Sequence, residues 1–209
     1  MSLKALLAFS LTVLCGGVSV MLMAQAGSAQ ALTGGALVAA LQKGGYVIVM
    51  RHASSPREAP SKQAANADNV KLERQLDEAG RAGSTAMGKA LRDLKIVIGQ
   101  VLSSPTYRAL ETVKFAQLPN PESHAELGDR GQSMQGVSEA DGKWLRDRAA
   151  QAPKSGNTLI VTHMPNVSRA FPQITGLSDG ESLAFRPDPK GGATLVGRIK
   201  IEEWPNLRP

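Results

Sequence analysis

The chain has 209 residues and a formal net charge of +6, with 42% hydrophobic and only 4% aromatic residues. This length fits one domain with a sizeable buried core, and a basic chain favours anionic partners. The basic residues are scattered, and with so few aromatic residues the chain lacks the basic stripe and stacking platform of a nucleic-acid-binding protein. We therefore expect no nucleic-acid partner.

Residues 1–31 form an apolar leader. Lys4 is the only charged residue in it, and the small-x-small sequence Ala29-Gln30-Ala31 closes it. This pattern is typical of a cleaved secretory signal peptide. We expect an exported, periplasmic or extracellular protein whose single domain covers residues 32–209, with no membrane span after processing. An uncleaved membrane anchor is the alternative, because the apolar stretch is nearly long enough to cross a bilayer.

The only cysteine, Cys15, lies in this leader. The mature chain is therefore expected to contain no disulfide, no thiol nucleophile and no cysteine metal site. The residues before Cys15 lack the small side chain that a lipoprotein signal needs next to its cysteine, so we do not expect lipid attachment there.

Helices and strands are expected to alternate along the mature chain. Segments with helical spacing and terminal capping or glycine residues predict helices over residues 36–43, 77–94, 107–115, 138–152 and 166–171. Short β-branched apolar runs predict strands over residues 46–51, 96–102, 158–162, 182–186 and 193–201. This order predicts an α/β fold, a three-layer sandwich with a mostly parallel central sheet, helices on both faces and an antiparallel edge.

Two histidines follow strands in matching ways. Arg51-His52 ends the first apolar run, and Thr162-His163 ends a later one. Ligands of open α/β sheets collect outside the carboxyl ends of the strands, so both imidazoles should reach one crevice. A neutral imidazole is a competent nucleophile toward phosphorus, and the guanidinium of Arg51 matches phosphate oxygens. The alternative for each histidine is a buried, hydrogen-bonded structural residue.

A third motif, Ser103-Ser104-Pro105, turns from a strand into a helix with Arg108 in its first turn. An arginine is unfavourable there because the helix dipole favours anions at that end. We expect an anion held jointly by Arg108 and the helix terminus. A solvated Arg108 paired with Glu111 is the alternative.

In their order along the chain, these motifs resemble the histidine phosphatase superfamily, the phosphoglycerate-mutase-like proteins. The resemblance covers essentially the whole mature chain and includes the segment 75–81, which is similar to the family's leucine-and-glycine helix start. It implies that His52 is the phosphorylated nucleophile and that Arg51, Arg108 and His163 bind the phosphoryl group. We expect no cofactor and no metal, because few carboxylates lie near either histidine.

At two places the sequence differs from the usual pattern of this superfamily, and these differences indicate which branch it resembles. Ala53 stands where the family usually has glycine, and Ser54-Ser55 replaces a frequent Glu-Thr pair. These residues argue against a phosphoglycerate mutase. Together with the leader, Ala53 and the small size look more like secreted bacterial members, including those that resemble lipopolysaccharide-core phosphatases. The implied partner is a small phosphorylated substrate that could come from the cell envelope, and the oligomeric state is open.

The leaving oxygen of a phosphate ester needs a proton, and a carboxyl group can supply it. Glu126 is our preferred general acid, because it lies roughly where one branch of the family keeps this group. Asp129 and Glu181 are the alternatives. Arg57, in the long loop after the first strand, is either a further substrate contact or a solvated arginine.

The sequence therefore predicts an exported, metal-independent phosphatase of the histidine acid type that hydrolyses phosphate monoesters through a phosphohistidine. A non-catalytic phosphate-binding domain of the same fold is the main alternative, since fold and chemistry are separable. A metal-dependent hydrolase built on the two histidines is a weaker alternative, because the chain has no His-x-His or His-Glu-x-x-His sequence.

Overall fold

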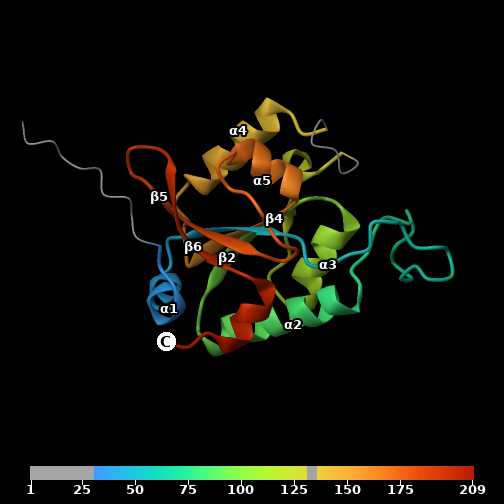
Figure 1. The fold of residues 1–209 in the computed structure, drawn as a ribbon, viewed down its shortest axis with the longest axis horizontal. Helices are drawn as coiled ribbons and strands as arrows, with labels where there is room; N and C mark the ends of the chain where they lie inside the picture. Colours follow the sequence, from blue (N-terminus) through green and yellow to red (C-terminus); the bar gives the residue numbers. More distant parts are fainter. Residues whose placement is uncertain (1–30, 131–135) are drawn as a thin grey trace, which may run out of the picture.

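The computed structural model describes residues 31–130 and 136–209. Six strands form one sheet in the order β3-β2-β4-β1-β5-β6 (Figure 1). The strands are β1 (Val47–Arg51), β2 (Ile98–Ser103), β3 (Glu122–Ser123), β4 (Asn157–Thr162), β5 (Ser182–Pro187) and β6 (Ala193–Ile199). The helices are α1 (Gly34–Lys43), α2 (Glu78–Asp93), α3 (Tyr107–Phe115), η1 (Ala125–Leu127), α4 (Glu139–Ala149), α5 (Met164–Ala170) and η2 (Ile201–Asn206).

The sheet is parallel at its centre and antiparallel at one edge. Strand β4 pairs in parallel with both β1 and β2, whereas β5 pairs antiparallel with β1 and with β6. The predicted α/β fold, its mostly parallel sheet and its antiparallel edge are therefore confirmed.

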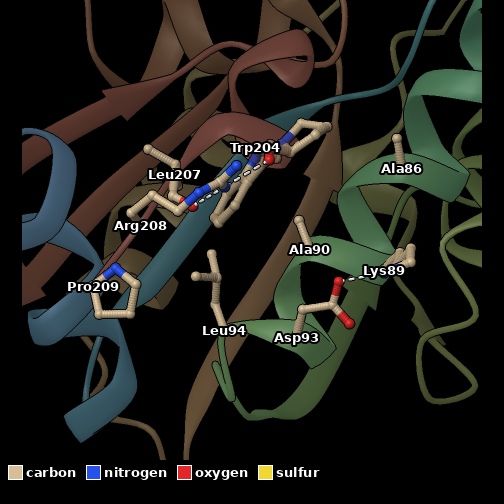
Figure 2. Close-up of a pocket in the computed structure, with 10 residues that line it drawn as sticks. Ala86, Lys89, Ala90, Asp93, Leu94, Trp204, Leu207, Arg208 and Pro209 are labelled. Atoms are coloured by element: carbon tan, nitrogen blue, oxygen red, sulfur yellow. Dashed lines mark hydrogen bonds and ion pairs between the residues drawn. The ribbon is translucent and has the colours of Figure 1, made fainter.

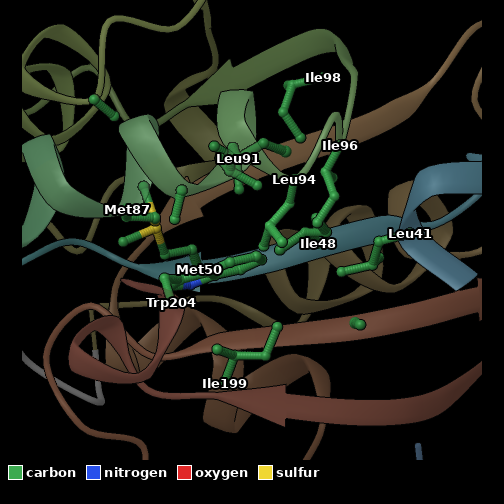
Figure 3. Packing of buried hydrophobic residues seen from close by; sticks show 14 of the residues in the cluster. Leu41, Ile48, Met50, Met87, Leu91, Leu94, Ile96, Ile98, Ile199 and Trp204 are labelled. Carbon is green, nitrogen blue, oxygen red and sulfur yellow. The ribbon is translucent and has the colours of Figure 1, made fainter. Parts of the chain in front are cut away.

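Each face of the sheet is covered by helices because successive side chains of a strand point to opposite faces. In β1, Ile48 and Met50 pack on one face into a core with α1, α2, α3 and Trp204 of η2 (Figures 1 and 3). Val47 and Val49 pack on the other face into a core that includes α4 and α5. A strand buried on both faces reads as a continuous apolar run, which is why β1 and β4 were recognisable in the sequence.

The structure differs from the sequence prediction mainly near the ends of elements. The last strand stops at Ile199, and a 3-10 helix, η2, follows it, with Trp204 buried against α2. The segment expected to be irregular contains a short edge strand, β3, and a 3-10 turn, η1. In the described part of the chain, no helix is long and apolar enough to span a membrane. The predicted leader lies almost wholly outside the described residues.

Candidate active site

The two strand-end histidines lie side by side. Strands β1 and β4 are neighbours in the sheet, and their last residues, Arg51 and Thr162, lie opposite each other. His52 follows β1 directly, and His163 follows β4 directly. Their ring centroids are 5.2 Å apart, and the side chains are almost completely buried. This placement follows directly from parallel pairing, because the carboxyl ends of parallel strands meet at one edge of a sheet.

His52 is held with one ring nitrogen available as a lone-pair donor. Its Nδ1 lies 2.7 Å from the carbonyl oxygen of Ala53, and a carbonyl only accepts, so Nδ1 carries the proton and Nε2 does not. The Nε–H of Arg108 donates to this Nε2 at 3.2 Å. Burial, with further contributions from His163 and the nearby arginines, lowers the pKa of His52 to about 2. The imidazole is therefore neutral and has the protonation state that a nucleophile requires.

Arg108 links the two histidines to a carboxylate. Its Nη2 donates to Nδ1 of His163 at 3.1 Å and forms an ion pair with Asp129. Nε2 of His163 lies 2.8 Å from Oγ of Ser104. Burial and the charge of Arg108 lower the pKa of His163 well below its usual value, so this ring is also neutral.

The start of α3 carries an anion, but the anion is a protein side chain. The backbone N–H of Tyr107 donates to a carboxylate oxygen of Glu73 at 3.0 Å. Arg108 itself is buried and turned toward the histidines. A substrate phosphate held jointly by Arg108 and the Tyr107 amide is therefore not supported. The amide is bound to Glu73, and Arg108 contacts the two histidines and Asp129.

An open cavity of about 330 Å³ lies over the two imidazoles. It is lined by Arg51, His52, Arg57, Arg74, Asp129, His163, Met164 and Pro165. The guanidinium of Arg51 is fixed at this edge by the carbonyl of Leu177, at 2.9 Å, and by Asp179. The cavity wall therefore combines two neutral imidazoles with several arginines, which suits a compact anion.

Arg74 is a cavity residue that the sequence analysis missed. It comes from the end of the long loop between β1 and α2, and its Nη2 donates to the carbonyl and hydroxyl oxygens of Ser55, at 3.0 and 2.7 Å. Burial lowers the pKa of Arg74. The signal that was available is its position two residues before Leu76, immediately ahead of the helix start that carried part of the family resemblance.

The start of α2 holds this loop against His52. The Asp77 side chain caps the helix by accepting from the N–H of Gly80 at 2.7 Å, and it also accepts from Oγ of Ser54 at 2.7 Å. A Cβ on Gly80 would lie 2.1 Å from the carbonyl oxygen of Ser54. Only glycine permits so close an approach, so α2 fixes the backbone that follows His52.

Of the three carboxyl groups considered as general acid, only Asp129 lines the cavity. Glu126 lies in η1, outside the set of lining residues, so the geometry does not support our first choice. Glu181 is buried in an ion pair with Arg198, at 2.6 Å. Burial acts to raise the pKa of Glu181, but hydrogen bonds from Arg198 and the Ser178 N–H outweigh it and the pKa is lowered. Glu181 is also absent from the residues that line the cavity.

A separate cavity of about 360 Å³ lies between α2 and the C-terminal segment (Figure 2). Trp204, Leu94 and Leu207 line it, and its charged residues include the Lys89–Asp93 pair on α2. No imidazole lines it. Among the described residues, no group of three or more histidine, cysteine or acidic side chains is arranged to hold a metal ion. The catalytic chemistry that the sequence suggested is therefore concentrated in the histidine cavity.

Comparison with known proteins identifies the fold. No family model and no curated protein matches the chain by sequence. The structure is similar to that of the protein histidine phosphatase SixA complexed with tungstate, with 22% identity, a TM-score of 0.54 and coverage of 76% of this chain and 98% of SixA. It is also similar to a mutant phosphoserine phosphatase from Entamoeba histolytica in complex with phosphoserine, with 12% identity, a TM-score of 0.52 and coverage of 75% and 98%. The chain therefore has the phosphoglycerate-mutase-like fold of these phosphatases.

Proposed function

We propose that this protein is a phosphatase of the histidine phosphatase superfamily that hydrolyses phosphate monoesters through a phosphohistidine on His52. The observation that carries the proposal is the state of this residue. Its Nδ1–H is fixed on the Ala53 carbonyl, its Nε2 is unprotonated, and burial keeps the ring neutral beside an arginine-lined cavity. The likeness to a protein histidine phosphatase and a phosphoserine phosphatase supports the same assignment.

The chemistry begins when a phosphoryl oxygen replaces Nε2 of His52 as the acceptor of the Arg108 Nε–H. This exchange frees the Nε2 lone pair, which attacks phosphorus while the bond from phosphorus to the ester oxygen breaks. Arg51, Arg108 and His163 hold the phosphoryl oxygens and stabilise their charge, which is where most phosphoryl-transfer catalysis lies. A carboxyl group gives a proton to the leaving oxygen, and its position in the cavity makes Asp129 the better candidate. Water then attacks phosphorus and gives one proton back to the carboxylate, while the P–N bond breaks, Nε2 of His52 regains its lone pair and inorganic phosphate leaves.

The setting of this activity is also a proposal. The leader suggests export to the periplasm or beyond, and the departures at Ala53 and Ser54-Ser55 suggest a secreted branch that resembles lipopolysaccharide-core phosphatases. A small phosphorylated substrate from the cell envelope is consistent with export and with this resemblance. Because one structural neighbour is a protein histidine phosphatase, a phosphoramidate belongs in the substrate panel beside the esters.

The decisive experiment is a rapid-quench reaction with ³²P-labelled substrate. We expect label on the peptide that contains His52, stable in base and lost in acid, because phosphoramidates have this stability and phosphoserine has the opposite one. Turnover of para-nitrophenyl phosphate should persist in chelator and should be inhibited by vanadate. Acid-stable label, or activity that disappears with chelator, would exclude the mechanism.

A phosphate-binding domain without turnover is the second candidate, and one feature favours it. Asp129, the only carboxylate that lines the cavity, is engaged in an ion pair with Arg108. The two functions separate cleanly, because a binding domain would bind inorganic phosphate or vanadate but release no product from any ester or phosphoramidate in the panel.

A further inference from the structure

We infer that Asp179 is a positioning residue for the site, and that it acts by fixing the guanidinium of Arg51. The inference rests on the proposed function and assigns a role to a segment that the mechanism above does not use. This segment is the turn at residues 177–181, between α5 and β5, which we call the Arg51 clamp.

Two of the three guanidinium nitrogens of Arg51 are bonded to the clamp, and the third is not. Nη1 donates to the carbonyl oxygen of Leu177 at 2.9 Å, and Nη2 forms an ion pair with Oδ1 of Asp179 at 2.5 Å. Nε is buried and has no hydrogen-bond partner among the described residues. A buried donor left without a partner costs free energy, so Nε is the donor that a phosphoryl oxygen in the cavity would satisfy.

Arg51 is the ion-pair partner of Asp179 among the described residues. The Oδ1 atom that meets Arg51 is buried and makes no other hydrogen bond within the described part of the chain. Asp179 does not line the cavity, whereas Asp129, the partner of Arg108, does. The two site arginines are therefore paired differently: the partner of Arg108 lines the cavity, whereas the partner of Arg51 does not.

The clamp is itself anchored to the histidine strand. The N–H of Gly180 donates to the carbonyl of His52 at 2.9 Å, and the N–H of Arg51 donates to the carbonyl of Glu181 at 3.1 Å. The Glu181 carboxylate accepts from the Ser178 N–H at 2.9 Å and from Arg198 at 2.6 Å. Through these contacts Glu181 stabilises the turn that contains Asp179.

An ionic partner on a rigid turn fixes where the guanidinium lies before substrate arrives. Arginine has many rotamers, and ordering it during binding has an entropic cost. Misplacing a catalytic group by about 1 Å can cost about 100-fold in rate. Asp179 therefore affects turnover mainly through Arg51, its direct partner, although its charge also acts to raise the pKa of Arg74. Most of its effect should vanish when Arg51 is absent.

The test is a double-mutant cycle on the full-length protein. Asp179→Ala should lower kcat/KM for para-nitrophenyl phosphate by about 10- to 100-fold, and Asp179→Asn should fall between it and wild type, since an amide oxygen still accepts. In an Arg51→Ala background, Asp179→Ala should change kcat/KM less than about twofold. Asp147→Asn, which removes an exposed ion pair with Lys143 on α4, is the matched control and should leave kcat/KM unchanged.

Three results would overturn the role. They are unchanged turnover in Asp179→Ala, an equal loss with and without Arg51, and tighter vanadate binding in Asp179→Ala, which would make Asp179 a competitor of the substrate. If the wild type turns over no substrate in the panel, the proposed phosphatase function fails. The clamp is then tested by calorimetry with vanadate, and the same dependence on Arg51 is expected in the binding constants.

Discussion

At the scale of single residues, the proposed mechanism depends on the neutral imidazole of His52 and on the buried guanidinium of Arg108. His52→Ala removes the nucleophile and should abolish turnover. Arg108→Ala removes a charge-stabilising donor and should lower kcat by about 100- to 1000-fold, and His163→Ala should cause a loss of the same order. Steady-state kinetics with an aryl phosphate measures all three.

The third histidine provides the control. His124 lies outside the cavity and packs against Trp144, with ring centroids 4.9 Å apart. His124→Ala should leave kcat unchanged. Near-normal turnover in His52→Ala, or an equal loss in His124→Ala, would show that the chemistry does not depend on this nucleophile.

Asp129 and Glu126 can be separated by the leaving group of the substrate. An alkyl phosphate needs a proton on its leaving oxygen, whereas para-nitrophenolate leaves without one. Asp129→Asn should therefore lower kcat for an alkyl phosphate by about 100-fold or more and lower it much less for the aryl ester. Glu126→Gln, which changes a carboxyl outside the cavity, should have no such selective effect. The reverse pattern would restore Glu126 as the acid.

At the scale of elements, the long loop between β1 and α2 is fixed on α3 by a buried carboxylate. Glu111 accepts from the Leu76 N–H and from Asn66, each at 2.7 Å, and burial raises its pKa. Glu111→Ala leaves the buried Leu76 N–H without its acceptor and should lower the free energy of unfolding by about 1–3 kcal/mol.

The same substitution should raise KM, because the loop carries Arg57 and Arg74 into the cavity. Glu111→Gln is the matched control: it keeps an acceptor oxygen and should change the free energy of unfolding and KM less. Denaturant titration and steady-state kinetics give the two quantities. A large KM change in Glu111→Gln alone, or none in Glu111→Ala, would mean that the loop is positioned by other contacts.

The elements also show which parts of the site were predictable. Strands β1 and β4 are buried on both faces, so their apolar runs and their following histidines were recognisable, and parallel pairing then places the histidines together. Other contacts of the site were not predictable from the sequence, namely those of Arg74, Glu73 and Asp179. They join segments that are distant in the sequence, and such contacts leave no periodic pattern. Glu126 was preferred over Asp129 because it lies roughly where one branch of the family keeps its general acid. No spacing rule shows which of these two carboxyl groups lines the cavity.

At the scale of the whole molecule, the two buried imidazoles couple stability to pH. The pKa of His52 is lowered to about 2 and that of His163 is lowered well below 6.5, whereas both return to about 6.5 in the unfolded chain. Below about pH 6.5 the unfolded state therefore binds more protons than the folded state, so the free energy of unfolding must fall as the pH falls. Above about pH 6.5 both histidines are neutral in the folded and the unfolded chain, so their contribution to the free energy of unfolding no longer changes with pH.

The expected loss is on the order of 1 kcal/mol for His52 by pH 5.5, and His163 contributes in the same direction. Most carboxyl groups remain charged in this window. Urea titrations of the phosphate-free protein at pH 7.5, 6.5 and 5.5 would measure it. His52→Ala should remove part of the slope and leave the part that comes from His163. A free energy of unfolding that does not change from pH 7.5 to 5.5 would mean that the imidazoles take up protons in the folded state. His52 could not then be the neutral nucleophile on which the proposed mechanism depends.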